Sequence, residues 1–142
     1  MSLLIRGGRI LDANGERALD VEIGDDGRIA AVGTGLNGDL DLDASDCVIS
    51  PGFVDLHTHL REPGQEEAET IETGARSGSL GGYTALVAMP NTEPTTDCVA
   101  VVEQVRALGR RSTCEIVPSA ALTVGRSGTK MAPLGELVDV GV

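Results

Sequence analysis

The chain has 142 residues, with 11 Lys and Arg against 22 Asp and Glu, and its net charge at pH 7 is -11. Such an acidic surface repels a phosphate backbone, so we expect no nucleic-acid partner. Apolar residues make up 41% of the chain and aromatic residues only 1%, which predicts a globular core built from aliphatic side chains.

The first fifty residues have the pattern of a small β unit. Short β-branched runs alternate with Asn-Gly and Asp-Gly dipeptides, which favour tight hairpin turns. The expected strands are 3–5, 21–23, 29–32 and 47–50, and the expected turns include Asn14-Gly15 and Asn37-Gly38. We therefore predict a small antiparallel unit over residues 1–50.

From residue 51 onward, apolar strands alternate with longer helical segments. The predicted strands are 53–57, 83–89 and 115–120, and the predicted helices are 66–80, 96–110 and 134–140. This alternation is typical of parallel βα units. Three such units fall short of the eight that close a barrel, so we interpret the chain as the N-terminal part of a longer protein. The alternative is a compact α/β domain of its own.

The second predicted helix carries the clearest internal signals. Val99, Val102, Val105 and Leu108 recur every three residues and predict one apolar face. Residues 94–97 read Pro-Thr-Thr-Asp and predict an N-cap, and Gly109 lies near the expected end.

The cysteines and the hydropathy pattern indicate the cellular setting. Cys47, Cys98 and Cys114 form no CxxC pair and lie among Val and Ile residues, as expected of buried thiols. No segment approaches the about 18 apolar residues of a membrane span, and the N-terminus lacks the apolar core of a signal peptide. We expect a cytoplasmic protein with no membrane association.

His57 and His59 are the only histidines of the chain, and they fall at the end of a predicted strand. Side chains two residues apart on a strand point to the same face, so both imidazoles can reach one metal ion. The carboxyl ends of barrel strands are also where barrel enzymes hold their reacting groups. Asp55 is expected to be a buried acid that accepts a hydrogen bond from the backbone or from a ligand histidine.

The acidic residues that follow predict no further ligand. They are read as the solvated first turns of a helix, where the helix dipole favours negative charge. This set is Glu62, Glu66, Glu67, Glu69 and Glu72.

The segment that contains these histidines, PGFVDLHTHLREPGQEEAETIETGARSGSLGGYTALVAMPNTEPTTD, resembles the N-terminal part of dihydroorotases, in the cyclic-amidohydrolase branch of the amidohydrolase superfamily. Residues 3–33 resemble the small β-sandwich strands that precede the barrel in this family, and residues 120–142 resemble the third barrel strand and the helix after it. The resemblance implies a β-sandwich segment over residues 1–50. Over residues 51–142 it implies about three βα units of a metal-dependent (β/α)8 barrel.

The same resemblance implies a site and a reaction. His57 and His59 match the pair that ligates zinc in a usually binuclear site. Arg61 matches the arginine that pairs with the substrate carboxylate, and Asn91 in the Met-Pro-Asn-Thr motif matches an asparagine at the same end of the substrate. The implied reaction is the reversible, zinc-dependent hydrolysis of dihydroorotate to N-carbamoyl-aspartate, a step in pyrimidine biosynthesis.

The rest of the family's site has no counterpart in this chain. The remaining metal ligands and the proton-shuttling aspartate are expected beyond residue 142, so no catalytic residue is assigned here. Because zinc sites normally use three or four protein ligands, we expect the chain alone to be inactive.

Two other functions stay open. The first is another ring-opening amidohydrolase, such as an allantoinase or a hydantoinase, whose substrates lack the carboxylate that Arg61 and Asn91 would bind. The second is a non-catalytic relative that associates with aspartate transcarbamoylase. A homo-oligomer is expected for the active enzyme.

Overall fold

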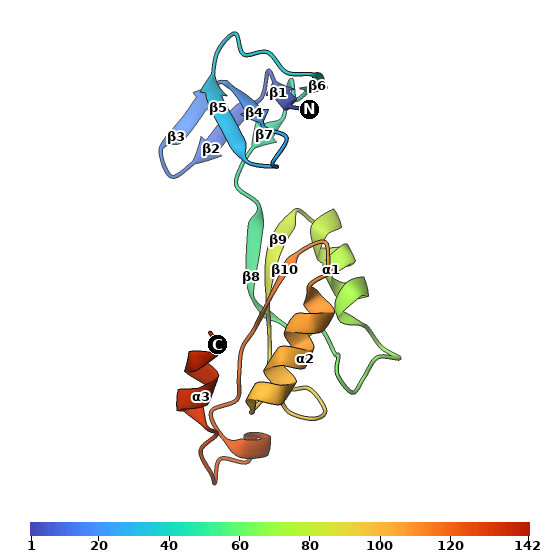
Figure 1. Cartoon of the computed structure of the whole chain (residues 1–142). Coiled ribbons are helices and arrows are strands. Elements are labelled where there is room, and N and C mark those ends of the chain that lie inside the picture. The colour runs from blue at the N-terminus through green and yellow to red at the C-terminus, as the bar shows by residue number, and fades with distance from the viewer. The chain divides into compact units, whose positions relative to one another are not determined.

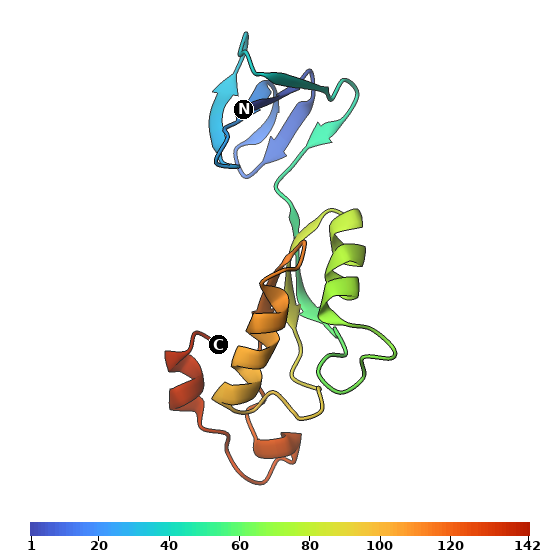
Figure 2. The ribbon, with the colours of Figure 1, turned by 45° about the vertical axis from the view of Figure 1, so that its right-hand side comes forward.

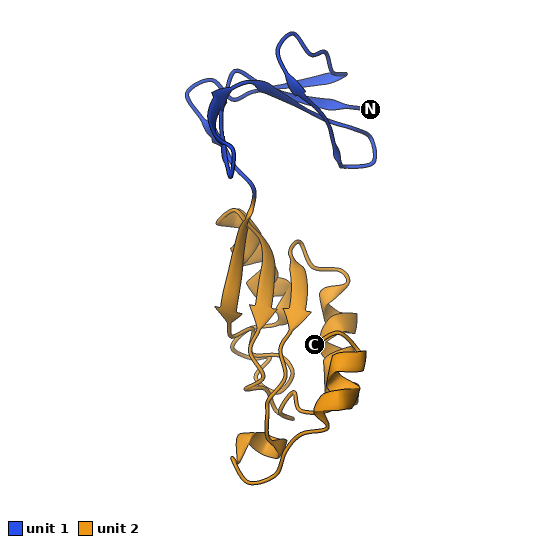
Figure 3. Cartoon of the chain, turned by 90° about the vertical axis from the view of Figure 1, so that its left-hand side faces the viewer, with its two compact units in different colours: residues 1–51 blue, residues 52–142 orange.

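The structure is a computed structural model that describes residues 1–142. It divides into two compact units, Met1–Pro51 and Gly52–Val142 (Figure 3). The first contains only strands, and the second alternates strands with helices. The chain therefore has a mixed α/β fold, as predicted. No helix in it is both long and apolar enough to cross a membrane.

The first unit is built from seven short strands in two sheets. The four-stranded sheet has the order β5-β4-β1-β6, and the three-stranded sheet has the order β3-β2-β7. The bounds are β1 (Leu3–Arg6), β2 (Arg9–Asp12), β3 (Gly15–Ala18), β4 (Asp20–Ile23), β5 (Ile29–Gly33), β6 (Leu40–Asp43) and β7 (Val48–Ile49). The prediction of a purely antiparallel unit was wrong, because β1 pairs with β6 and β2 with β7 in parallel.

The predicted turn at Asn14-Gly15 is confirmed as the β2–β3 hairpin. Gly15 has a φ of 94°, a conformation that glycine adopts without the steric cost of a side chain. The backbone N–H of Asn14 donates to Oδ1 of Asp12 at 2.8 Å, and this contact lowers the pKa of the Asp12 carboxyl. The two flanking strands, β2 and β3, were not predicted, since neither has a long apolar run.

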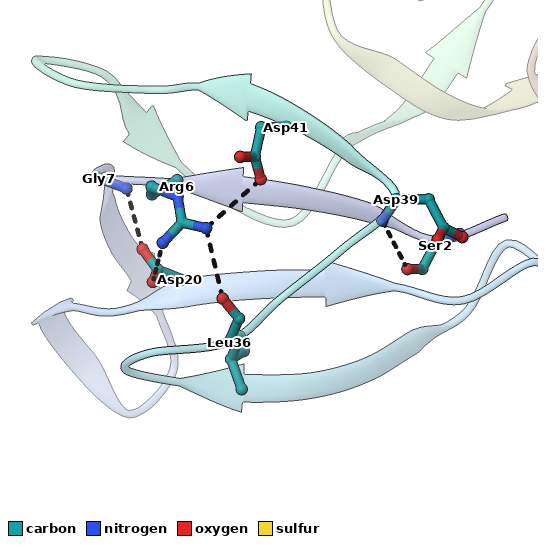
Figure 4. A network of polar contacts seen from close by, with 7 residues as sticks. All are labelled: Ser2, Arg6, Gly7, Asp20, Leu36, Asp39 and Asp41. Carbon is teal, nitrogen blue, oxygen red and sulfur yellow. Dashed lines mark hydrogen bonds and ion pairs between the residues drawn. The ribbon is translucent and has the colours of Figure 1, made fainter.

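Arg6 connects three segments of the first unit (Figure 4). Its guanidinium lies 3.9 Å from Oδ2 of Asp20 on β4 and 3.5 Å from Oδ1 of Asp41 on β6, and it donates to the carbonyl of Leu36 at 3.4 Å. Ion pairs this exposed contribute little free energy. Stability in this unit therefore comes chiefly from its small buried core, which comprises Leu4, Ile10, Val21 and Ala44.

The second unit is a parallel sheet covered by helices. Its three strands are arranged in the order β10-β9-β8 and are all parallel. Helices α1 and α2 lie along the same face of this sheet in both views (Figures 1 and 2). The bounds are β8 (Phe53–Thr58), α1 (Ile71–Leu80), β9 (Tyr83–Ala88), α2 (Val99–Gly109), β10 (Glu115–Pro118), a short 3-10 helix η1 (Val124–Arg126) and α3 (Leu134–Asp139). The predicted alternation of strand and helix is confirmed.

The core of the second unit lies between the sheet and the two helices. It comprises Leu60, Ile71, Ala75, Leu86, Ala88, Val105, Cys114 and Ile116. Val102 and Val105 of α2 are buried as predicted, but Leu108 is 38% exposed. A step of three residues falls short of one helical turn of 3.6, so after three such steps Leu108 lies on the opposite side of the helix from Val99.

The predicted starts of the first two helices were wrong, whereas α3 begins at Leu134 as predicted. Helix α1 begins at Ile71, because Thr70 forms a capping box with Thr73 and the preceding acidic segment forms turns. Helix α2 begins at Val99 with Cys98 as an N-cap that makes no side-chain hydrogen bond. Asp97, which was expected to help cap α2, accepts instead from the backbone N–H of Gly125 at 2.6 Å.

The three cysteines differ in exposure. Cys114 is buried, Cys98 is half-buried and Cys47 is exposed, so the expectation of three buried thiols was wrong for Cys47. The Cys114 thiol donates to the carbonyls of Ala75 and Tyr83 at 3.2 and 3.1 Å. This thiol therefore links α1 to the start of β9.

Candidate functional site

The candidate site lies at the carboxyl ends of β8 and β9. The backbone N–H of Met89 donates to the carbonyl of Thr58 at 2.9 Å, so the two strands end level with each other. All three strands of this sheet point to the same end, where their connecting loops gather (Figure 3). The residues that directly follow Thr58 and Ala88 therefore lie at the same end of the sheet, where the parallel strands have their carboxyl ends.

His57 and His59 lie next to each other at this edge. Their ring centroids are 5.1 Å apart and the rings meet edge to face at 63°. Both side chains are exposed. Oδ1 of Asp55 accepts from the backbone N–H of His57 at 2.9 Å, so the expected bond of Asp55 to the backbone is present, although Asp55 is half-buried and not fully buried.

Asn91 comes from the loop after β9 and contacts His59. Its Oδ1 lies 2.7 Å from Nδ1 of His59, although the two residues are 32 positions apart in the sequence. Three of the four residues expected at the site, His57, His59 and Asn91, therefore form one cluster. The family resemblance predicts Asn91 at the site, and nothing in the sequence signals its contact with a histidine.

Arg61 lies in the loop directly after β8 and is exposed. Its backbone is in the left-handed region with a φ of 67°. The ion pairs of the chain use other arginines, namely Arg6, Arg9, Arg17, Arg28 and Arg106. The Arg61 guanidinium is thus available to a ligand, but no contact joins it to the histidine and asparagine cluster.

The loop that carries Arg61 packs against the loop that carries Asn91. The backbone N–H of Glu93 donates to the carbonyl of Pro63 at 2.9 Å. Gly64 has a φ of 104°, and a Cβ placed on it would lie 2.3 Å from the carbonyl oxygen of Glu93. The close approach of the two backbones therefore requires glycine at this position.

Two acids from the segment between Arg61 and α1 stabilise this loop. Oε1 of Glu66 accepts from the backbone N–H of Gly64 at 2.7 Å, and this bond lowers the pKa of the Glu66 carboxyl. Oε2 of Glu62 accepts from the backbone N–H of Ile71 at 2.7 Å, at the start of α1. Both had been interpreted as solvated helical residues. Nothing in the local sequence signals the Glu62 contact, because its partner is nine residues away.

Two buried threonines hold the Asn91 loop. The hydroxyls of Thr92 and Thr96 are 2.9 Å apart, and Thr92 Oγ1 also donates to the carbonyl of Pro94 at 2.7 Å. The backbone N–H of Thr96 donates to the carbonyl of Pro90 at 3.2 Å. Asn91 is therefore presented by a loop with its own hydrogen-bonded frame.

The donor set of this cluster fits part of a zinc site. Imidazole nitrogen is a common zinc ligand, and two imidazoles converge here. No group of three or more His, Cys, Asp or Glu side chains in the chain is arranged so that it could hold a metal ion. The chain thus offers two ligands, together with an amide and a guanidinium that can bind an anion.

Comparisons with known proteins give a consistent result. A model of the dihydro-orotase-like family matches residues 46–142. The dihydroorotase of Streptomyces coelicolor is 49% identical over 138 residues, which cover 94% of this chain and 31% of that protein. The dihydroorotase of Mycobacterium tuberculosis is 47% identical over 142 residues, which cover 96% and 32%.

Solved structures share the fold. The L-hydantoinase from Arthrobacter aurescens matches with a TM-score of 0.79 and 21% identity, over 97% of this chain and 30% of that one. At this identity the match concerns the fold alone. The chain spans about a third of the length of the curated relatives that it matches.

Proposed function

Because this chain belongs to the dihydro-orotase-like family, we propose that it is the N-terminal part of a dihydroorotase. The enzyme would hydrolyse the cyclic amide of dihydroorotate reversibly to N-carbamoyl-aspartate. The observation that carries the proposal is the cluster of His57, His59 and Asn91. His57 lies at the end of β8, His59 directly follows that strand, and Asn91 comes from the loop after β9.

In this proposal His57 and His59 would hold the metal. Zinc fits their nitrogen donors, and in the family the site is usually binuclear. When bound there, zinc would lower the pKa of a water molecule and polarise the amide carbonyl of the substrate. The two histidines would hold the ion at the carboxyl end of β8, and the remaining ligands are expected beyond residue 142.

Arg61 and Asn91 bind the carboxylate of the substrate. A guanidinium presents two parallel N–H donors that match a carboxylate, and the amide of Asn91 adds a further donor. The packed loops around Gly64 and Glu93 support both residues from the same edge of the sheet. Binding energy from the carboxylate would thereby orient the amide ring for hydrolysis.

The wider architecture is also part of the proposal. Residues 1–50 would form the β-sandwich segment, and residues 51–142 would form the first βα units of a (β/α)8 barrel. Both outer strands of the three-stranded sheet have an unpaired edge, and Val54 and Leu56 of β8 are 54% and 74% exposed. Further strands of a barrel would pair with those edges and cover these side chains.

The remaining expectations complete the proposal. A homo-oligomer is expected for the whole enzyme, and the proton-shuttling aspartate is expected beyond residue 142. A reducing, cytoplasmic setting is supported by the cysteines, which are all free thiols. Association with aspartate transcarbamoylase stays an alternative.

A chimera tests the proposed reaction. Residues 1–142 of this chain would replace the matching third of the Streptomyces coelicolor dihydroorotase, and turnover of dihydroorotate, hydantoin and allantoin would be measured. We expect turnover of dihydroorotate, which His57→Ala reduces at least about 100-fold because a metal ligand is lost. Turnover of only hydantoin or allantoin by a folded, zinc-loaded chimera would instead assign a different cyclic amide.

Substitution of Arg61 in the same chimera tests whether this residue binds the carboxylate of the substrate. Arg61→Met should raise KM for dihydroorotate about 10- to 100-fold, because a hydrogen bond to a charged group contributes about 1.5–3 kcal/mol. Arg76→Met removes an exposed arginine from α1 and is the matched control. An unchanged KM in Arg61→Met would remove the carboxylate role. A folded chimera that binds the transcarbamoylase without turnover of any substrate would support the non-catalytic alternative.

A further inference from the structure

The contact between Asn91 and His59 bears on the protonation of the imidazole. The side-chain oxygen of an amide accepts hydrogen bonds and cannot donate them, so the hydrogen in this 2.7 Å contact belongs to Nδ1 of His59. A neutral imidazole carries a single N–H. Nε2 of His59 is therefore left with its lone pair free.

We propose that Asn91 is a positioning residue for the metal ligand His59. Its side-chain oxygen holds His59 in the Nδ1–H tautomer, so that Nε2 is the nitrogen that binds metal. This inference rests on the proposed metal site, and it adds to Asn91 a role beyond substrate binding. The hydrogen bond that one ring nitrogen makes determines which nitrogen is free to act as a ligand.

The two ends of the Asn91 amide can serve both roles. The oxygen contacts His59, and the amide NH2 group carries two further donors that take no part in this contact. A substrate carboxylate accepts such donors without competing for the oxygen. One side chain would therefore link the orientation of a metal ligand to the end of the substrate that Arg61 binds.

The surroundings of the two histidines differ in a way that supports this assignment. Asp55 accepts a hydrogen bond from the backbone N–H of His57, and this bond does not restrain the His57 ring. His59 follows the last residue of β8, where the ladder no longer restrains it, and its ring is held by Asn91. Asn91 can impose an orientation because the next residue, Thr92, is buried and its hydroxyl is hydrogen-bonded to that of Thr96.

Nitrogen NMR of the 142-residue chain tests the tautomer directly. The chain has only two histidines, so a long-range proton–nitrogen spectrum contains two imidazole patterns, and His57→Gln assigns them. The spectra are recorded in metal-free, mildly alkaline buffer. We expect the Nδ1–H pattern for His59 in the unmodified chain and a mixture of tautomers in Asn91→Ala.

Two variants separate this role from loss of folding. Asn91→Asp keeps an oxygen acceptor, so His59 should retain the Nδ1–H pattern. Asn37→Ala removes an exposed asparagine of the first unit and should change neither ring. Backbone amide spectra report whether each variant is folded. An Nε2–H pattern for His59 in the unmodified chain, or an unchanged pattern in folded Asn91→Ala, would overturn the proposal.

Zinc affinity and KM in the chimera separate the two roles of Asn91. Asn91→Ala should weaken zinc binding about 10- to 100-fold, as is typical when the partner of a ligand histidine is lost. Asn91→Asp should retain zinc but raise KM, since a second carboxylate repels that of the substrate. Equal zinc affinity in the alanine and unmodified chimeras would contradict the proposal. The NMR measurement of the His59 tautomer needs neither metal nor turnover. A failure of the dihydroorotase assignment would therefore show in the chimera's turnover and not in the NMR result.

Discussion

Gly64 shows how one residue determines the geometry of two loops. Its left-handed backbone and its short distance to Glu93 place the loop after β8 against the loop after β9. Neither requirement is visible in the local sequence, where Pro63-Gly64 predicts only a turn. The positions of Arg61 and Asn91 at one edge of the sheet depend on this approach.

We predict that Gly64→Ala destabilises the second unit more than Gly128→Ala does. Gly128 has a φ of 75° and open space within 4 Å of where a Cβ would lie, so alanine there costs only the left-handed conformation, about 1–2 kcal/mol. At Gly64 the clash with the Glu93 carbonyl adds about 1–3 kcal/mol. Urea unfolding followed by fluorescence of Tyr83, the single tyrosine, measures both. An equal loss in the free energy of unfolding for both variants would mean that the two loops move apart at no cost in stability.

At the scale of elements, α1 is defined by its first turn. Thr70 Oγ1 accepts from the backbone N–H of Thr73 at 3.2 Å, and Thr73 Oγ1 accepts from the backbone N–H of Thr70 at 3.0 Å. Glu62 satisfies the N–H of Ile71 from outside the helix. These contacts satisfy three of the backbone donors that a helix start leaves unpaired. The acidic run before Thr70 has helical propensity, but the cap decides where the helix begins.

We expect Thr70→Ala to lower the free energy of unfolding by about 0.5–2 kcal/mol, as is usual for the loss of an N-cap. Thr70→Ser should restore most of this loss because the hydroxyl is kept. Thr113→Ala, at an exposed loop position, is the control and should have little effect. The same tyrosine fluorescence measures all three variants. If Thr70→Ala matched the control, Glu62 alone would account for the start of α1.

At the scale of the whole molecule, the chain contains part of a site and separate buried clusters in its two units. The first unit buries Leu4, Ile10, Val21 and Ala44, and the second buries the larger cluster between its sheet and helices. The candidate site lies at the carboxyl ends of the strands of that sheet, and neither histidine belongs to a core cluster. Folding of the second unit and assembly of a complete metal site are therefore distinct requirements.

We predict that the 142-residue chain alone does not hydrolyse dihydroorotate and holds less than one zinc ion per chain. Its two histidines supply fewer than the three protein ligands that a catalytic zinc site normally needs. Turnover and zinc content would be measured against the His57→Ala chain, which accounts for contaminating enzyme. Activity in the unmodified chain that His57→Ala abolishes would show that the missing ligands are supplied in another way.

Much of the fold could be predicted because it depends on local pattern. Period-two and helical spacing of apolar residues located the strands and helices of the second unit, and the Asn14-Gly15 dipeptide located a hairpin turn. The unpredicted parts were the parallel pairing of β1 with β6 and of β2 with β7, the starts of α1 and α2, and the exposure of Leu108. These depend on partners distant in the sequence or on the exact helical angle.

The sequence by itself determined the strands and the longer helices of the second unit, the family resemblance and the residue types of the candidate site. The pair His57 and His59 is adjacent along the chain, so the alternation of a strand was enough to bring the two rings together. Only the tertiary structure decided that Asn91 contacts His59 and that Glu62 caps α1. Such contacts form when parallel strands end level and their loops pack, and no local pattern encodes which atoms then meet.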